Sequence, residues 1–323
     1  MEHNVPIKSM FHKFILTSPS FRLPMKFTNG LLALCIVSLT SCNQQPRKTA
    51  EALFKHAEDG LPKYDLKAPT SKYFLPYVLE EISGLSYVRP GVLACVQDEE
   101  GKMFFYNHEN RILEKDLRFG KAGDYEGVEI VGDTAYVIKS NGTIFKFDFG
   151  EGFDLNNVRE IKTKLKKPND VEGLAFDRIK NDMIIACKGK AGLKKDEKMK
   201  GRAFYKYDLK KDKLDKEPKF RITKKDIKKF LETHNDFQYE ESRINFHPSG
   251  IAHHPHRDLF YIIASTGKLM IIADRKGNIK GTAPLDPRLF GQPEGICFAP
   301  NGDLFISSEG QGDKGYILKF RMK

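Results

Sequence analysis

Three glutamates occupy the same place in a short recurring phrase, and any chemistry of this chain would depend on them. Glu126, Glu172 and Glu294 each come directly before a glycine and an aliphatic residue. In two more copies of the phrase the same place is held by Ser83 and Ser249. Two carboxylates ~5 Å apart repel by roughly 3 kcal/mol at an effective dielectric near 20. Glutamates gathered at one point would therefore become protonated, pair with a lysine, or bind a hard cation such as Ca²⁺.

The spacing of the phrase predicts a fold that would gather these residues. The phrase glycines are separated by 43, 46, 77 and 45 residues, and short apolar segments divided by turn sequences follow each one. A period in the forties with strand-like content is typical of a β-propeller, with one phrase for each blade. We therefore predict an all-β fold, a five-bladed β-propeller over residues 72–323, with six blades as the alternative.

The strand pattern of single repeats supports this prediction. In the second repeat the predicted strands are Gly127–Val131, Ala135–Ile138 and Thr143–Phe147, and Asn141-Gly142 is a hairpin signal between the last two. The chain ends soon after the third strand of the last repeat, so that blade lacks an outer strand. We expect Tyr73–Leu79, which precedes the first phrase, to supply it and close the ring, because open sheet edges invite aggregation.

Propeller topology predicts which other side chains share the channel mouth with the glutamates. The innermost strand of each blade runs along the central channel, and the second strand returns to the mouth where the first began. Since the phrase opens the innermost strand, its copies form a ring at one mouth. The ends of the second strands should add further side chains to it: Asp98, Lys139, Lys188 and Glu309. The phrase glycine itself is explained by crowding of the backbones at the axis.

Two interpretations of this acidic ring are open. In the first, Glu126, Glu172 and Glu294 bind a divalent cation, and oxygen-only ligands from separate strands favour Ca²⁺ or Mg²⁺ over zinc. In the second, the glutamates are structural and cap neighbouring backbone N–H groups, or they surround water. Ser83 and Ser249 have no base assigned by the sequence, which contains no nucleophile-elbow or phosphate-loop motif.

The positive charge of the chain is concentrated in one segment. Residues 188–229 hold 18 Lys plus Arg and 7 Asp plus Glu, a net charge of +11, which equals the formal charge of the whole chain. The segment lies in the longest gap between phrases, so we predict a Lys-rich insertion at about 189–245 with a short helix, Thr223–Thr233. Thr223 and Asp226 form a capping-box-like start for this helix. Aromatic residues are not interleaved with these lysines in a regular pattern, and the chain is expected to be exported. We therefore expect an anionic ligand or lipid head groups as partner and no nucleic acid.

The N-terminal region resembles the leader of a bacterial lipoprotein. Met25-Lys26 and the apolar run of residues 30–39 are typical of a secretory signal, and the run is too short to span a bilayer. It ends in Leu39-Thr-Ser-Cys42, which resembles a lipobox and implies lipidation of Cys42 with cleavage before it. The alternative is an ordinary signal with a chance cysteine. Met25 is also the expected start of translation, in place of Met1.

This leader sets the expected organisation and location of the chain. Residues 1–41 would be leader and signal peptide, and residues 42–71 a lipidated, flexible tether to the membrane. No acidic cluster follows Cys42, which favours the outer membrane of the bacterial cell envelope, facing the periplasm.

The cysteines and histidines are not expected to form a metal site. Cys95, Cys187 and Cys297 lie in separate apolar segments without a CxxC spacing, so we expect buried, unpaired thiols. The group His253-His-Pro-His256 follows the innermost strand of the fourth blade, where we expect an exposed turn at the opposite face.

The repeated Glu-Gly-aliphatic openings and the closing stretch Gln292–Glu309 resemble the SdiA-regulated (YjiK-like) family over about residues 72–323. The resemblance implies an exported or membrane-associated propeller. The family is related more distantly to esterase-like phytases and calcium-dependent phosphotriesterases, which hold a metal at the channel mouth.

Two functions follow as expectations. The first is a membrane-tethered binding module with a divalent-cation site, presenting a surface to an anionic ligand or an envelope protein. The alternative is a calcium-dependent hydrolase of phosphate esters or lactones, in which Lys139 or Lys188 would stabilise the developing charge. We favour binding because no pairing of a base with a nucleophile is evident, and whether the chain is an enzyme stays open.

Overall fold

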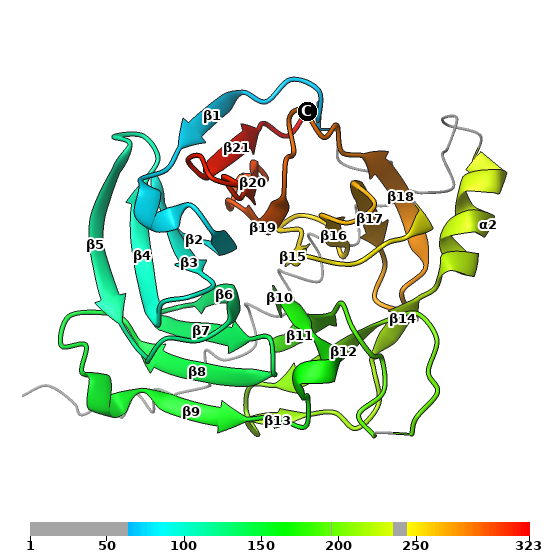
Figure 1. Cartoon of the computed structure of the whole chain (residues 1–323), viewed down its shortest axis with the longest axis horizontal. Helices are drawn as coiled ribbons and strands as arrows, with labels where there is room; N and C mark the ends of the chain where they lie inside the picture. Colours follow the sequence, from blue (N-terminus) through cyan, green and yellow to red (C-terminus); the bar gives the residue numbers. More distant parts are fainter. Residues whose placement is uncertain (1–63, 195, 235–243) are drawn as a thin grey trace, which may run out of the picture. The chain divides into compact units, whose positions relative to one another are not determined.

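The computed structural model describes residues 64–194, 196–234 and 244–323. The predicted leader, Cys42 and residues 43–63 of the predicted tether lie outside these ranges. The described residues form five antiparallel sheets arranged around a common centre, which confirms the prediction of an all-β, five-bladed propeller (Figure 1). The described residues of the long gap between the third and fourth phrases do not form a sixth blade.

Four of the blades share a plan of four antiparallel strands. Blade one contains β2 (Ile82–Arg89), β3 (Val92–Gln97), β4 (Lys102–Asn107) and β5 (Ile112–Arg118). Blade two contains β6 (Tyr125–Val131), β7 (Thr134–Lys139), β8 (Thr143–Asp148) and β9 (Arg159–Lys162). Blade four contains β15 (Gly250–His253), β16 (Phe260–Ala264), β17 (Leu269–Ala273) and β18 (Ile279–Pro284). Blade five contains β19 (Pro293–Phe298), β20 (Leu304–Ser308), β21 (Tyr316–Phe320) and, from the start of the described chain, β1 (Ser71–Phe74). Short 3₁₀ helices lie at Tyr77–Leu79, Leu155–Asn157 and Lys167–Asn169.

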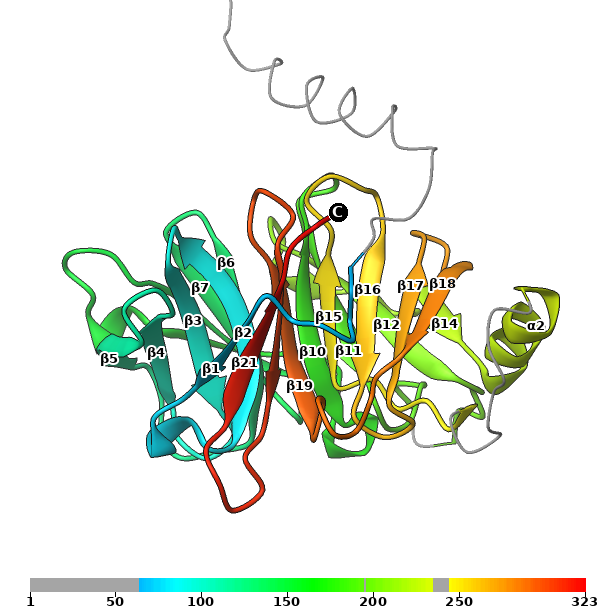
Figure 2. The ribbon, with the colours of Figure 1, turned by 90° about the horizontal axis from the view of Figure 1, so that it is seen from above.

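Strand β1 closes the ring as predicted. It pairs antiparallel with β21, with Tyr73 opposite Ile317, and Figure 2 shows the two strands side by side. The strand begins earlier than the predicted Tyr73–Leu79 and is shorter. It ends before Pro76, because proline has no N–H for a ladder, and a 3₁₀ helix follows. The innermost strands contact one another in the order β2, β6, β10, β15 and β19, and β19 contacts β2 again.

Blade three carries the extra chain length. It contains β10 (Val171–Asp177), β11 (Asp182–Cys187) and β12 (Arg202–Asp208), with two short outer strands that both pair with β12, β13 (Lys213–Leu214) and β14 (Phe220–Ile222). The segment 189–245 therefore supplies the outer strands of this blade as well as a long loop and helix α2 (Lys224–His234). Helix α2 begins with the capping box suggested by the sequence, since Thr223 N donates to Asp226 Oδ2 at 2.9 Å and Asp226 N donates to Thr223 Oγ1 at 3.2 Å.

Apolar side chains fill the spaces between neighbouring blades. Between blades three and four, Phe204 and Phe220 stack with ring centroids 4.6 Å apart, and Phe260 packs beside them. With no Trp in the chain, Phe, Tyr and aliphatic residues make up these layers. Cys95, Cys187 and Cys297 are buried and free, as predicted. No helix within the described ranges has the length and apolar character needed to cross a membrane.

The expectation of an exposed histidine turn was wrong, because the N-terminal arm covers that blade. His253 and His254 are buried, and only His256 of the three is exposed. Tyr64 donates a hydrogen bond to the carbonyl of Gly302 at 2.7 Å, and its hydroxyl lies 2.9 Å from His254 Nε2. Residues 64–70 of the predicted tether thus pack on the propeller, a contact between distant segments that local sequence does not reveal.

Candidate functional site

The three glutamates of the phrase meet at the propeller axis. Glu126, Glu172 and Glu294 come from the starts of β6, β10 and β19 in three different blades. Together with Ser83 and the phrase glycines they line an axial cavity of about 10 Å³. A cavity of this size is at the lower limit for holding one water molecule. The axial cavity is therefore a small polar site rather than an open channel.

The close approach of the innermost strands at the axis requires the glycine of each phrase. A Cβ added to Gly84 would lie 2.9 Å from Gly127 Cα, and one added to Gly250 would lie 2.3 Å from the carbonyl oxygen of Glu294. One added to Gly295 would lie 3.0 Å from Leu85 N, in the first blade. The predicted crowding at the axis is thus present between successive blades and across the closure of the ring.

A β-bulge lies in four of the five phrases, including the three that contain a glutamate. The register of the innermost pair shifts around Glu126 in blade two and around Glu172 in blade three. In blade five the shift includes Glu294, and in blade one it includes Ser83. A bulged residue leaves the ladder and its side chain is re-aimed.

One lysine reaches the glutamates. Lys188 Nζ donates to Glu172 Oε1 at 2.8 Å, and the Glu172 side chain is 7% exposed. Burial raises the pKa of Glu172 to about 7, with the charge and hydrogen bond of Lys188 opposing a larger rise. Burial by itself would lower the pKa of Lys188, but the nearby Glu172 raises it, so this lysine stays charged.

The other two glutamates hold protons at neutral pH. Burial, followed by the charge of Glu172 and a hydrogen bond with Asp124, raises the pKa of Glu126 to about 10. Burial, followed by the charges of Glu172 and Glu309, raises the pKa of Glu294 to about 8. Two of the three ways to relieve the repulsion, protonation and pairing with lysine, are therefore in use.

Two further carboxylates lie nearer the mouth. Burial, then the charge of Glu81, raises the pKa of Asp98 to about 6, and burial, then the charge of Asp98, raises that of Glu309 to about 7. Gln292 Nε2 donates to Glu309 Oε2. Asp98 Oδ1 is buried without a hydrogen-bond partner among the described residues. The structure thus brings Asp98 and Glu309 together, as the topology predicted.

The other residues predicted at the mouth, Lys139, Ser83 and Ser249, contact an aromatic ring or a backbone carbonyl. Lys139 Nζ lies 5.0 Å from the centre of the Tyr125 ring. Ser83 Oγ donates to the carbonyl of Tyr125 at 2.6 Å, and Ser249 Oγ donates to the carbonyl of Pro293 at 2.6 Å. Each serine therefore joins its phrase to that of the next blade and is not presented as a nucleophile.

The carboxylate oxygens at the axis are of the kind that binds a hard cation, but their positions in this structure do not form a metal site. Carboxylate oxygens from separate strands are ligands that Ca²⁺ accepts. Among the described residues, however, no group of three or more His, Cys, Asp or Glu side chains stands in a geometry able to hold a metal ion. Binding of Ca²⁺ would require Glu126 and Glu294 to lose their protons and the carboxylates to turn toward one point.

Solved structures are similar to this chain at low identity. A glutaminyl cyclase from Myxococcus xanthus has a TM-score of 0.49 at 12% identity, with 79% of this chain and 96% of that chain covered. A PQQ-bound aldose sugar dehydrogenase from Streptomyces coelicolor has a TM-score of 0.45 at 12% identity, with 79% and 100% covered. A luciferin-regenerating enzyme has a TM-score of 0.43 at 13% identity, with 80% and 95% covered.

No curated protein matches this chain. The SdiA-regulated family matches residues 59–312, well over half of the sequence, from before β1 to just after β20 in blade five. The phrase that recurs in every blade and the closing stretch of blade five lie largely within this match. The chain therefore belongs to the SdiA-regulated family.

Proposed function

We propose that this propeller is a binding module of the bacterial cell envelope, with a divalent-cation site at its axis and a surface for an anionic ligand. The observation that carries the proposal is the meeting of Glu126, Glu172 and Glu294 at one axial cavity. Among the described residues, Glu172 is the one axial glutamate that forms an ion pair with a lysine. Carboxylates that share so little positive charge have an affinity for a hard cation, and Ca²⁺ tolerates the irregular geometry that such a site would offer.

The role of the cation would be structural and positional. A Ca²⁺ ion bound by strands of blades two, three and five would add a direct link between these blades at the axis. A ligand that binds the folded state alone stabilises a protein by RT ln(1 + [L]/Kd), so the stabilisation grows with the logarithm of ligand concentration. The proposal therefore predicts a stability that depends on Ca²⁺, whatever partner the module has.

The experiment is thermal unfolding of the full chain at pH 8, in EDTA and in millimolar Ca²⁺. We expect Ca²⁺ to raise the Tm, and Glu172→Gln to remove most of that increase. The matched control is Glu151→Gln, which neutralises an exposed carboxylate in the turn after β8. An unchanged Tm in Ca²⁺, or an equal loss in both variants, would contradict the axial site.

A second measurement separates binding from hydrolysis. The full chain is incubated with p-nitrophenyl phosphate, p-nitrophenyl acetate and a lactone, with and without Ca²⁺. We expect no turnover, since Ser83 and Ser249 each donate to a backbone carbonyl. Turnover that depends on Ca²⁺ and is lost in Glu172→Gln would instead favour the calcium-dependent hydrolase.

The membrane anchor is a separate part of the proposal. The sequence around Cys42 supports a lipidated cysteine that holds the module at the outer membrane, facing the periplasm. Metabolic labelling with an alkyne fatty acid should mark the wild-type chain and not Cys42→Ser, and the variant should leave the membrane fraction. Equal labelling of both chains would overturn this assignment.

A further inference from the structure

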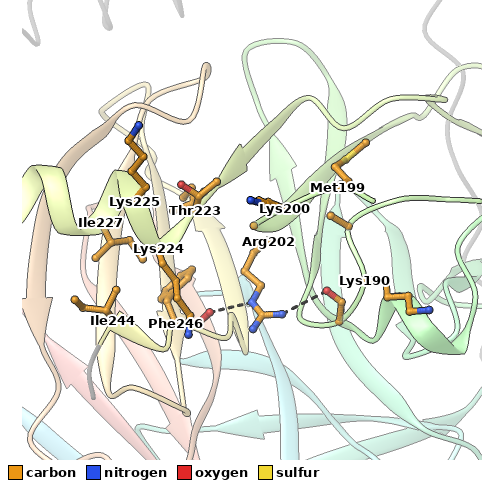
Figure 3. A pocket seen from close by; sticks show the side chains of 14 residues that line it. Lys190, Met199, Lys200, Arg202, Thr223, Lys224, Lys225, Ile227, Ile244 and Phe246 are labelled. Atoms are coloured by element: carbon orange, nitrogen blue, oxygen red, sulfur yellow. Dashed lines mark hydrogen bonds between the residues drawn. The ribbon is translucent and has the colours of Figure 1, made fainter. Parts of the chain in front are cut away.

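A second hollow, larger than the axial cavity, lies beside the basic segment of blade three. It has a volume of about 640 Å³, within the usual range of small-molecule sites, and shares no lining residue with the axial cavity (Figure 3). Its walls come from the β11–β12 loop, the start of β12, the end of β14, the first turn of α2 and the segment before β15. We refer to it as the basic cavity.

One side of the basic cavity is apolar. Ile222, Ile227 and Phe246 line it and are buried, each at most 3% exposed. Ile244 is partly buried beside them, and Met199, also partly buried, lines the cavity on the other side of Arg202 (Figure 3). An apolar surface of this kind removes the hydrocarbon part of a ligand from water, which is favourable in proportion to the area buried.

The charge of the basic cavity has a single sign. Its lining contains no Asp or Glu and five basic residues, Lys190, Lys200, Arg202, Lys224 and Lys225. None of the five makes an ion pair within the part of the chain that the structure describes, whereas other lysines nearby do: Lys188 with Glu172, Lys206 with Asp215 and Lys211 with Asp208. Positive charge that is not compensated within the described protein favours a negatively charged ligand.

Among the basic residues of the cavity, Arg202 has a charged group that hydrogen bonds hold in place. Its guanidinium is half-buried and donates to neutral acceptors, the carbonyls of Phe246 at 3.0 Å, Gly189 at 3.4 Å and Lys188, and the ring Nε2 of His247 at 2.6 Å. Burial lowers the pKa of His247 and the charge of Arg202 lowers it further, so this ring is neutral. The guanidinium is thus positioned by four partners, and no carboxylate of the described residues forms an ion pair with it.

The first turn of α2 adds to the same effect. Lys224 and Lys225 lie at the N-terminal end of an 11-residue helix, whose dipole attracts anions. The Asp226 side chain accepts the Thr223 N–H in the capping box and offsets part of the dipole. The lysines and Arg202 therefore supply most of the attraction.

We propose that the basic cavity binds a small amphiphilic anion, a carboxylate or phosphate monoester joined to an apolar body. The head would lie among Arg202, Lys200 and Lys224, and the body against Ile227, Ile244 and Phe246. This inference deepens the anionic-ligand part of the proposed function by assigning it a site and a ligand class. It does not depend on the axial cation, because the two sites share no residue.

The test is isothermal titration calorimetry of the full chain in EDTA, which removes any contribution from Ca²⁺. The probes are decanoate and decyl phosphate below their micelle concentrations. 1-Decanol has the same apolar body without charge, and acetate and inorganic phosphate have the charge without the body. We expect both amphiphiles to bind at least about tenfold more tightly than any of the three controls.

The matched variants remove equal charge from two places. Lys200→Gln with Lys224→Gln takes two exposed lysines from the rim of the basic cavity, and Lys210→Gln with Lys213→Gln takes two exposed lysines from the β12–β13 hairpin of the same blade. We expect the first pair to weaken decanoate binding at least about tenfold and the second less than about twofold. Circular dichroism melts check that both variants remain folded.

Three outcomes would overturn the proposal: no binding of either amphiphile, equal binding of 1-decanol, or equal weakening by the two pairs of substitutions. A vesicle arm identifies the alternative source of the same chemistry. If the chain sediments with anionic phosphatidylglycerol vesicles but binds neither soluble amphiphile, the basic segment recognises a membrane surface and the basic cavity is not a ligand site. Failure of the axial Ca²⁺ measurement would leave these expectations unchanged.

Discussion

Lys188 and Glu172 form an ion pair at 2.8 Å, and this lysine is the one cation that the described residues bring into contact with the axial glutamates. Glu126 and Glu294 lie at the same cavity without such a partner, and burial keeps both of them protonated near neutral pH. In the absence of a bound cation, protonation of Glu126 and Glu294 therefore relieves the repulsion between the carboxyl groups at the axis. That state makes the stability of the fold depend on pH.

We predict that the free energy of unfolding in EDTA falls as pH rises from about 5 to about 8. Below the ordinary pKa of 4.5, Glu294 is protonated in both states. Above it the unfolded chain ionises while the folded chain keeps the proton until its pKa of about 8, so rising pH favours unfolding in this window. Glu172, with a pKa of about 7, acts in the same direction.

The variant Glu294→Gln removes this cost for one side chain. It should stabilise the protein at pH 8 by on the order of 1–3 kcal/mol and change it little at pH 5. Urea unfolding at the two pH values measures the difference, with Glu151→Gln as the exposed control. Equal effects of both variants at pH 8 would mean that Glu294 is ionised in the folded protein.

The close approach of Gly250 to Glu294 gives a prediction about the phrase itself. A Cβ on Gly250 would lie 2.3 Å from the Glu294 carbonyl oxygen. Because this oxygen belongs to the backbone of a neighbouring innermost strand, the clash could be relieved only by moving one of the two strands. We expect Gly250→Ala to cost about 3 kcal/mol or more of unfolding free energy. Gly150→Ala is the control, since a Cβ there meets nothing within 4 Å, and it should change stability by less than ~0.5 kcal/mol. Similar losses in both would contradict axial packing as the reason for the glycine.

A buried ion pair joins blades three and four away from the glutamates. Arg275, in the turn after β17, donates to both oxygens of Asp177 at the end of β10, with Nη2 2.8 Å from Oδ1, and its Nε donates to Asp258 at 2.6 Å. Burial would raise the pKa of Asp177, but the hydrogen bonds and charge of Arg275 hold it below its ordinary value. Asp177 is fully buried, so removal of its partner leaves an uncompensated charge.

We expect Arg275→Met to cost roughly 3–5 kcal/mol, and Asp177→Asn in the same chain to recover part of that loss. Asn at position 177 retains an oxygen for the backbone N–H groups of Ile179 and Lys180 that now donate to Asp177 Oδ1. Arg288→Met, which breaks an exposed pair with Asp286, should leave stability unchanged in the same urea series. If the double variant is no more stable than Arg275→Met, the effect is loss of packing rather than of a charge pair.

The parts of this structure that sequence could predict are those fixed by periodicity. The spacing of Gly84, Gly127 and their equivalents gave the blade number, because one glycine is needed wherever two innermost strands approach at the axis. The same topology placed Glu126, Glu172 and Glu294 at one point, since residues equivalent in each blade are equivalent in space. Helix α2 was predicted to within one residue from its capping box, which is a local signal.

The parts that escaped prediction depend on contacts between distant segments. The basic cavity is built from residues 189–246, and its apolar wall forms only because Phe246 and Ile244 return beside α2. The protonation of the glutamates depends on burial, which residue types alone do not give. The histidine turn was misplaced for the same reason: its cover, Tyr64, lies 190 residues earlier in the chain.

That cover is the subject of the last prediction. His254 Nδ1 accepts the backbone N–H of His256 at 3.1 Å, so its Nε2 carries the proton and donates to the Tyr64 hydroxyl, which in turn donates to the Gly302 carbonyl. Burial, then the charges of His256 and His253, lowers the pKa of His254 to about 3, so the ring stays neutral and the chain of hydrogen bonds persists at neutral pH. The arm before β1 is thereby held on blades four and five, next to the strand that closes the ring.

Tyr64→Phe would keep the ring of this side chain among Tyr261 and Phe298 but leave His254 Nε2 and the Gly302 carbonyl without their partner. We expect a loss of about 1–3 kcal/mol in the free energy of unfolding and faster proteolytic cleavage within residues 64–70. Tyr77→Phe, at a side chain 64% exposed, is the control and should match the wild type in both measurements. If Tyr64→Phe changes neither stability nor cleavage, the arm is not held by these hydrogen bonds, and the closure of the ring rests on the pairing of β1 with β21 alone.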